Sequence, residues 1–171
     1  MEKSMGKFDG VLLVSDFDGT LYGSRHQIGE RNIQALLSFM KQGGRFTVAT
    51  GRVRRIFADY AGVVPMNAPA ILANGAALYD FETGRMLEQT LLPEESIEMF
   101  KAVCEVFPEL GFETYHDEEI YAYRPNAVTE GHMKKVGCSY IRAERIEDIP
   151  LPWEKVLFQQ EHDLLLQVQN W

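Results

Sequence analysis

The sequence is poor in cysteine: its 171 residues include only Cys104 and Cys138, which lie far apart. They form no Cys-x-x-Cys pair, so neither a disulfide framework nor a cysteine-based zinc site is expected. The four histidines show no spacing typical of metal ligands either. Inert thiols in a reducing compartment fit this pattern, and we expect a cytoplasmic protein.

Long hydrophobic runs and positive charge are also scarce. The polar first seven residues and the short apolar run after them match neither a signal peptide nor a membrane span. Lys and Arg number 17 against 25 Asp and Glu, which gives a net charge of −8. This balance disfavours general affinity for nucleic acid or an anionic membrane. With 46% hydrophobic residues and no repeats, the chain is expected to be globular, with one domain or a small domain plus part of another.

The first prominent pattern is a run of four aliphatic residues at 11–14. After Ser15 it is followed by Asp16-Phe17-Asp18-Gly19-Thr20. An unbroken apolar run predicts a strand buried on both faces, as inside a parallel sheet. The strand breaks at the end where open α/β sheets bind their ligands. Side chains two apart in a strand point the same way, so Asp16 and Asp18 start on one side.

Two carboxylates in this position predict a Mg²⁺ and phosphate site. A hard cation holds a carboxylate and a phosphate oxygen together, and the backbone N–H groups of Phe17 and Asp18 are expected to face the same point. Asp16 is then the nucleophile that forms an aspartyl-phosphate. Asp18 protonates the leaving oxygen and later takes a proton from water. The alternative, an ordinary Asp-Gly turn, is disfavoured by the length of the motif.

The motif resembles the first motif of the haloacid dehalogenase superfamily, most of whose members are Mg²⁺-dependent phosphatases. The resemblance implies that Asp16 and Asp18 are catalytic and bind Mg²⁺, and that the partner is a small phosphorylated metabolite.

The rest of the first half alternates strands and helices. Apolar residues at helical spacing predict a helix around 33–40 and a second at 53–60, and short apolar runs predict strands at 46–49 and 70–73. This β-α-β-α-β order predicts a parallel sheet with helical crossovers.

Polar residues follow the second and third of these strands. Thr50 lies where the superfamily carries a Ser or Thr that binds the transferring phosphoryl group, and Gly51-Arg52 and Asn74 resemble its Cof-type sugar-phosphate phosphatase branch. The resemblance implies that Phe17, Thr50, Gly51, Arg52 and Asn74 bind the substrate phosphate. Two alternatives stay open: Thr50 as a helix N-cap, and Asn74-Gly75 as a tight turn between Leu72 and Leu78.

The second half has a different pattern. A helix that opens at Pro93, a hairpin from 111–115 and 120–123, a helix near 127–135 and a strand at 155–158 resemble the α+β cap of Cof-type phosphatases. We therefore expect an α/β fold with two parts: residues 1–86, an incomplete Rossmann-like parallel sheet core, and residues 87–171, a partial α+β cap domain.

Two motifs of the superfamily are missing: a Lys that balances charge at the phosphate, and an acidic Gly-Asp loop that completes the Mg²⁺ site. Because phosphoryl transfer depends on charge neutralisation, we expect this chain alone to be a weak or inactive phosphatase. The alternative is a non-catalytic phosphate-binding or interaction protein. An open sheet edge and an apolar end also favour self-association.

Overall fold

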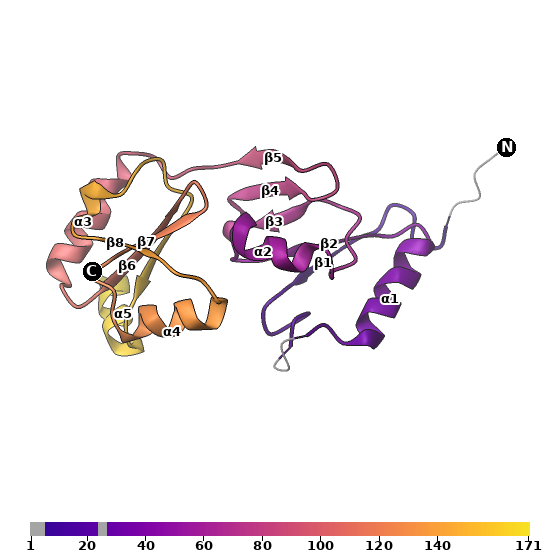
Figure 1. The fold of residues 1–171 in the computed structure, drawn as a ribbon, viewed down its shortest axis with the longest axis horizontal. Coiled ribbons are helices and arrows are strands. Elements are labelled where there is room, and N and C mark those ends of the chain that lie inside the picture. The colour runs from indigo at the N-terminus through magenta and orange to yellow at the C-terminus, as the bar shows by residue number, and fades with distance from the viewer. Residues whose placement is uncertain (1–5, 24–26) are drawn as a thin grey trace. The chain divides into compact units, whose positions relative to one another are not determined.

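The computed structural model describes residues 6–23 and 27–171 and divides the chain into two compact units, residues 1–89 and 90–171 (Figure 1). Unit 1 holds the motifs that follow the first three strands. Unit 2 holds the helix-and-hairpin segment. Each unit has its own sheet and its own cluster of buried apolar side chains.

Unit 1 is a five-stranded sheet in the order β1-β2-β3-β4-β5 with two helices. Its elements are β1 (Leu12–Asp16), α1 (Glu30–Lys41), β2 (Arg45–Ala49), α2 (Arg54–Ala61), β3 (Ala70–Leu72), β4 (Ala77–Asp80) and β5 (Arg85–Gln89). The first three strands are parallel and are joined by the two helices, as the alternating pattern predicted. Strands β4 and β5 are antiparallel, so the sheet is mixed.

Strand β1 lies at the edge of this sheet, and the prediction that it is buried on both faces was wrong. Its only partner within the described part of the chain is β2. The four aliphatic side chains at 11–14 are between 42% and 54% exposed. An aliphatic run indicates a strand, but burial depends on neighbouring elements that the run itself does not supply.

The core of unit 1 forms beneath the strand ends that carry the motifs. Phe17, the residue between the two aspartates, is fully buried against Phe57 and the ring of Tyr22. Apolar side chains of β2 and β3 complete this cluster. The motif is therefore anchored to the core through its central residue, while Asp16 and Asp18 stay at the surface.

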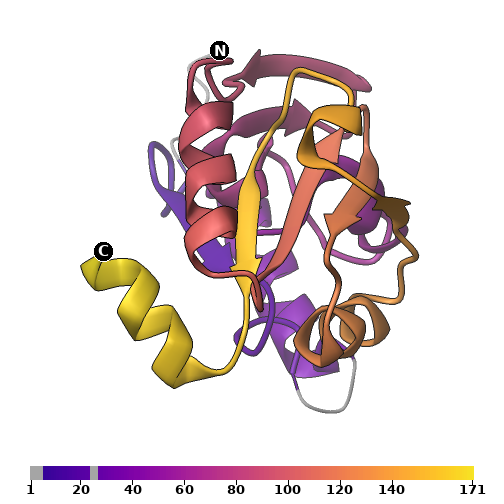
Figure 2. The ribbon, with the colours of Figure 1, turned by 90° about the vertical axis from the view of Figure 1, so that its left-hand side faces the viewer.

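Unit 2 is a four-stranded sheet in the order β8-β7-β6-β9. Its elements are α3 (Ser96–Val106), β6 (Gly111–His116), β7 (Glu119–Tyr123), α4 (Ala127–Val136), β8 (Ile141–Ala143), β9 (Val156–Gln159) and α5 (His162–Asn170). In Figure 2, α3 lies along the sheet beside β9, whereas α5 extends away from it and has no buried residue. Strand β8 and helix α5 were not predicted from the sequence.

Local signals explain the ends of several elements in unit 2. The β6–β7 hairpin, which the sequence predicted, turns at Asp117 and Glu118, both with positive φ. Helix α4 begins with a capping box between Asn126 and Thr129. It ends at Gly137, which has a φ of 72° and the left-handed conformation that glycine adopts without strain.

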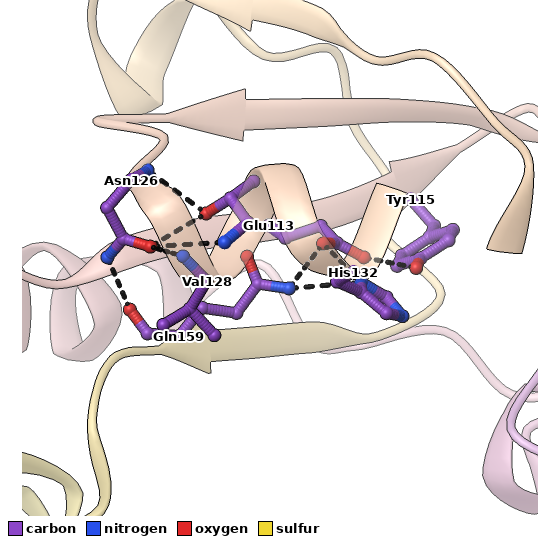
Figure 3. Close-up of polar contacts among 7 residues, drawn as sticks. Glu113, Tyr115, Asn126, Val128, His132 and Gln159 are labelled. Atoms are coloured by element: carbon purple, nitrogen blue, oxygen red, sulfur yellow. Dashed lines mark hydrogen bonds and ion pairs between the residues drawn. The ribbon is translucent and has the colours of Figure 1, made fainter. Parts of the chain in front are cut away.

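A buried polar cluster ties α4 to the sheet of unit 2 (Figure 3). Glu113 on β6 is fully buried, and its carboxylate accepts hydrogen bonds from the Tyr115 hydroxyl, from Gln159 Nε2 at 2.7 Å and from His132 Nδ1 at 3.0 Å. Burial would raise the pKa of Glu113, but these donors outweigh that effect and the pKa is lowered. The cluster therefore holds a carboxylate in its charged form inside the unit.

Among the described residues, no helix is both long and apolar enough to cross a membrane.

Candidate active site

Asp16 is the last residue of β1 and stands at the carboxyl end of the parallel strands. Its Oδ2 accepts a hydrogen bond of 2.7 Å from the hydroxyl of Thr20. Its Oδ1 has no hydrogen-bond partner in the described part of the chain. The side chain is exposed, so a substrate can reach this oxygen from solvent.

The chain turns tightly after Asp16, which brings Thr20 back beneath it. Gly19 has a φ of 80°, a left-handed conformation that favours glycine. The Gly19 N–H donates to the Tyr22 carbonyl at 2.9 Å, and the Tyr22 N–H donates to the Phe17 carbonyl at 2.8 Å. These bonds fix the loop, so the sequence Gly-Thr after the second aspartate sets the orientation of the first.

Thr50 follows β2 directly, next to the end of β1, because Ala49 pairs with Asp16. Its N–H donates to the Ile71 carbonyl at 2.9 Å, and its buried hydroxyl accepts the Arg52 N–H at 3.2 Å. Helix α2 takes Val53 as its N-cap, with no side-chain cap bond. The interpretation of Thr50 as the N-cap of that helix was therefore wrong; its hydroxyl closes the turn before the helix.

Asn74 lies against Gly51 and so joins the loops after β2 and β3. A Cβ atom on Gly51 would lie 2.6 Å from Asn74 Oδ1. The Asn74 N–H donates to the Thr50 carbonyl at 3.1 Å. Asn74 also has a φ of 59° in the short turn that leads into β4, which pairs antiparallel with β3. Asn74 therefore makes the expected turn, and that turn packs on Thr50 and Gly51; its contact with a substrate phosphate stays a prediction.

Arg52 makes a two-pronged ion pair with Asp18. Its Nε and Nη2 lie 2.9 and 2.8 Å from the two carboxylate oxygens. The arginine is 8% exposed and the aspartate 40%. The hydrogen bonds to Asp18 raise the pKa of Arg52 above its ordinary value, so the guanidinium is charged at every accessible pH.

This pairing occupies two nitrogens of Arg52. The family resemblance implied that Arg52 binds the substrate phosphate, and that role stays a prediction. The third nitrogen, Nη1, is buried and has no acceptor among the described residues. The Tyr60 hydroxyl is the other polar group that raises the pKa of Arg52, after Asp18, so it also lies near the guanidinium.

Two aromatic rings enclose the guanidinium of Arg52. Its central carbon lies 4.7 Å from the ring centroid of Tyr60 and 5.3 Å from that of Phe17. Tyr60 belongs to α2, and its ring meets those of Phe17 and Tyr22 edge to face, each at 5.1 Å. Sequence reasoning missed Tyr60 because its helical spacing from Ile56 and Phe57 is also that of an ordinary core position.

The oxygen atoms at this strand end suit Mg²⁺ only in part. Mg²⁺ is bound in proteins by one or two carboxylates while keeping waters and substrate oxygens. The exposed carboxylate of Asp16 meets that need, whereas both Asp18 oxygens accept from Arg52. No group of three or more His, Cys, Asp or Glu side chains gathers around a common point in residues 6–23 and 27–171. Residues 6–23 and 27–171 therefore offer a weak anchor for the ion, without a full carboxylate cage.

Relatives with phosphatase names match part of this chain. A Mycoplasma pneumoniae protein that carries such a name is 29% identical over 112 residues, which are 65% of this chain and 39% of that protein. The HMP-PP phosphatase of Escherichia coli O157:H7 is 30% identical over 88 residues, which are 52% of this chain and 32% of the enzyme. The chain thus spans less than half the length of these relatives.

Solved structures agree on the fold. A haloacid dehalogenase-like hydrolase from Bacteroides thetaiotaomicron matches with a TM-score of 0.77 at 25% identity, covering 96% of this chain and 62% of that one. A subclass IIB sugar phosphatase matches with a TM-score of 0.75 at 18% identity, covering 94% and 62%. The model of the haloacid dehalogenase-like hydrolase family matches residues 13–170. With this match over nearly the whole sequence, the chain belongs to the haloacid dehalogenase-like hydrolases, as the motif at Asp16 predicted.

Proposed function

We propose that this chain carries the part of a Mg²⁺-dependent phosphatase that includes the nucleophile, and that the substrates are small phosphorylated metabolites. The observation that carries the proposal is the state of Asp16: one carboxylate oxygen is fixed by Thr20, and the other is open at the carboxyl end of a parallel sheet. A carboxylate held in this way has one oxygen free to attack. The phosphatase names of the relatives support the same reaction.

The reaction begins with Asp16. Its Oδ1 attacks phosphorus, the bond from phosphorus to the substrate oxygen breaks, and an aspartyl-phosphate forms. Asp18 gives its proton to the leaving oxygen, and the resulting carboxylate takes a proton from the water that later attacks the aspartyl-phosphate. The second step releases phosphate and restores Asp16.

The observed Arg52 pair fits the second role of Asp18 directly. A carboxylate that accepts two N–H bonds is in its charged form, which is the form that takes a proton from water. When Asp18 carries a proton, one oxygen still accepts from Arg52 while the other holds the proton. Asp18 can therefore change protonation state without leaving the arginine.

Around Asp16, the loops after β2 and β3 provide the phosphate contacts. We assign Thr50, Gly51 and Asn74 to this part of the site together with the backbone at Phe17, because these loops pack on one another beside the end of β1. Mg²⁺ held by Asp16, with Asp18 beside it, would reduce the repulsion between carboxylate and phosphate. With so few carboxylates in reach, we expect weak metal binding and slow turnover by this chain alone.

The test is hydrolysis of an aryl phosphate with and without Mg²⁺, comparing the unmodified chain with Asp16→Asn. Turnover that needs Mg²⁺ and disappears in Asp16→Asn supports the proposal. Asp80→Asn is the control, since Asp80 ends β4 and its carboxylate accepts hydrogen bonds from Glu82 and Thr83 in the following turn. Turnover that persists in Asp16→Asn would overturn the assignment of the nucleophile.

The second candidate, a phosphate-binding protein without turnover, is favoured by the incomplete carboxylate set. It predicts that inorganic phosphate shifts the backbone amide signals of Thr50 and Gly51 in NMR spectra while no aryl phosphate is cleaved. Substrate turnover separates the two functions in one sample.

We also infer that copies of this chain associate through β1, because its aliphatic side chains are exposed and its outer edge is unpaired in the described residues. Sedimentation velocity over a range of concentrations tests this, with Leu13→Lys expected to favour the monomer.

The free thiols of Cys104 and Cys138 support a reducing compartment, and we place the protein in the cytoplasm.

A further inference from the structure

We propose that Tyr60 is a positioning residue: its ring holds the guanidinium of Arg52 so that both hydrogen bonds to the Asp18 carboxylate are kept. The inference rests on the proposed function for its catalytic meaning, but its structural part stands on contacts alone. These contacts form a chain that starts on helix α2 and ends at the second aspartate of the motif.

The first link is the stacking of Arg52 on aromatic rings. The guanidinium carbon is 4.7 Å from the Tyr60 centroid, closer than the 5.3 Å to Phe17. An arginine over a tyrosine face is attracted by the ring quadrupole, and the attraction grows when water is excluded. Arg52 is 8% exposed, so this contact is largely desolvated.

The second link is the fork between Arg52 and Asp18. Two parallel hydrogen bonds of 2.9 and 2.8 Å fix the plane of the carboxylate relative to the plane of the guanidinium. Rotation of the guanidinium would break at least one of them. Whatever fixes the guanidinium plane therefore also fixes the direction of the Asp18 oxygens.

The third link is the support of Tyr60 itself. Its ring contacts Phe17 and Tyr22 edge to face, each at 5.1 Å, and Phe17 is fully buried. Phe17 lies between Asp16 and Asp18 in sequence, so the same aromatic group anchors the motif and carries the arginine. This arrangement gives Tyr60 a function that its position on a core-facing helix does not reveal.

The test uses the Nε–H signal of Arg52 in ¹⁵N-labelled protein. A guanidinium held in a buried fork is expected to give a resolved Nε–H signal that exchanges slowly with water, and Asp18→Asn identifies the signal by removing it. We expect Tyr60→Leu to speed this exchange about tenfold, while Tyr60→Phe, which keeps the ring and loses only the hydroxyl contact with Arg52, speeds it about threefold at most.

A matched control is available on the same helix. Arg54 lies 5.3 Å from the ring centroid of Tyr79, so Tyr79→Leu removes a second arginine–tyrosine contact in unit 1, one that involves neither Arg52 nor Tyr60. This variant should leave the Arg52 signal unchanged. If Tyr60→Leu fails to fold, Tyr60→pentafluorophenylalanine keeps the ring shape, reverses the ring electrostatics and should still speed exchange.

Steady-state kinetics of the same Tyr60 variants provide a second measurement. For the active chain, we expect Tyr60→Leu to lower kcat about tenfold with little change in KM, and Tyr60→Phe to restore it. An unchanged Arg52 Nε–H signal in both Tyr60→Leu and the pentafluorophenylalanine variant would overturn the inference. Absence of turnover in the unmodified chain would count against the proposed function alone, because the Nε–H exchange would still be measured.

Discussion

Gly51 and Asn74 approach so closely that any side chain at position 51 would displace the amide of Asn74. A Cβ atom at residue 51 would lie 2.6 Å from Asn74 Oδ1, far inside van der Waals distance. The loops after β2 and β3 are therefore fitted to each other at this point. The Gly of the Thr-Gly-Arg sequence is therefore required by its neighbour Asn74.

Gly51→Ala is expected to push Asn74 away from Thr50 and to lower aryl phosphate turnover at least tenfold, since small displacements of positioned groups cost about a hundredfold in enzymes. Gly62→Ala is the matched control, because a Cβ there meets no atom within 4 Å. Steady-state kinetics and the amide signals of the two loops provide the measurement. Equal kinetics in the two alanine variants would contradict this view of the contact.

Thr20→Val is expected to lower turnover without unfolding the protein. It removes the hydroxyl that donates to Asp16 Oδ2, and a hydrogen bond to a charged group contributes about 1.5–3 kcal/mol, or about 10- to 100-fold in rate. Thr83→Val removes the same type of bond, from a threonine to Asp80, at the far end of β4. Rates that fall equally in both variants would argue against a role in orienting the nucleophile.

Glu113 should make unit 2 sensitive to acid. The pKa of Glu113 is lowered in the folded protein, so its contribution to stability is complete above the ordinary pKa of a glutamate. That contribution is lost as the pH falls through the lowered folded value. We expect the Tm of the unmodified chain to fall over this acidic range, and the Tm of Glu113→Gln to fall less steeply.

At neutral pH, Glu113→Ala is expected to destabilise the protein by about 3 kcal/mol, because it leaves His132, Tyr115 and Gln159 without their buried acceptor. Urea unfolding gives the change in free energy. Glu105→Ala, at an exposed site on α3, should change the free energy of unfolding very little. A similar loss in both variants would show that the buried cluster does not stabilise unit 2.

The two cysteines should differ in reactivity. Burial raises the pKa of Cys104 to about 11, so about 0.1% of it is thiolate at pH 8. Cys138 is half-buried and more accessible to reagents. Iodoacetamide labelling followed by mass spectrometry should find Cys138 modified first in the folded protein, with both modified at comparable rates in guanidinium chloride. Faster labelling of Cys104 in the native state would contradict the burial of its thiol.

The sequence allowed good prediction where local pattern and structure coincide. The strand before Asp16, the two crossover helices and the β6–β7 hairpin follow from apolar periodicity and turn residues, which act over a few positions. The motif at Asp16 also predicted the family, because the order of its residues is specific.

Features that depend on tertiary neighbours were missed. The exposure of β1 depends on which strands flank it, and the aliphatic run at 11–14 carries no information about that. The pairing of Arg52 with Asp18 joins residues 34 positions apart, so no local pattern indicates it. Strand β8 is only three residues long and pairs with β7 through a crossover, which leaves almost no periodic signal.

The one-sided pairing of β1 has a consequence for its backbone. In a strand with a single neighbour, alternate amide groups point outward and have no acceptor in the sheet. These outward amides should exchange their hydrogens with heavy water within the dead time of the experiment, while the inward ones are protected. The strand that presents Asp16 is thus firmly held along one side and open to solvent along the other.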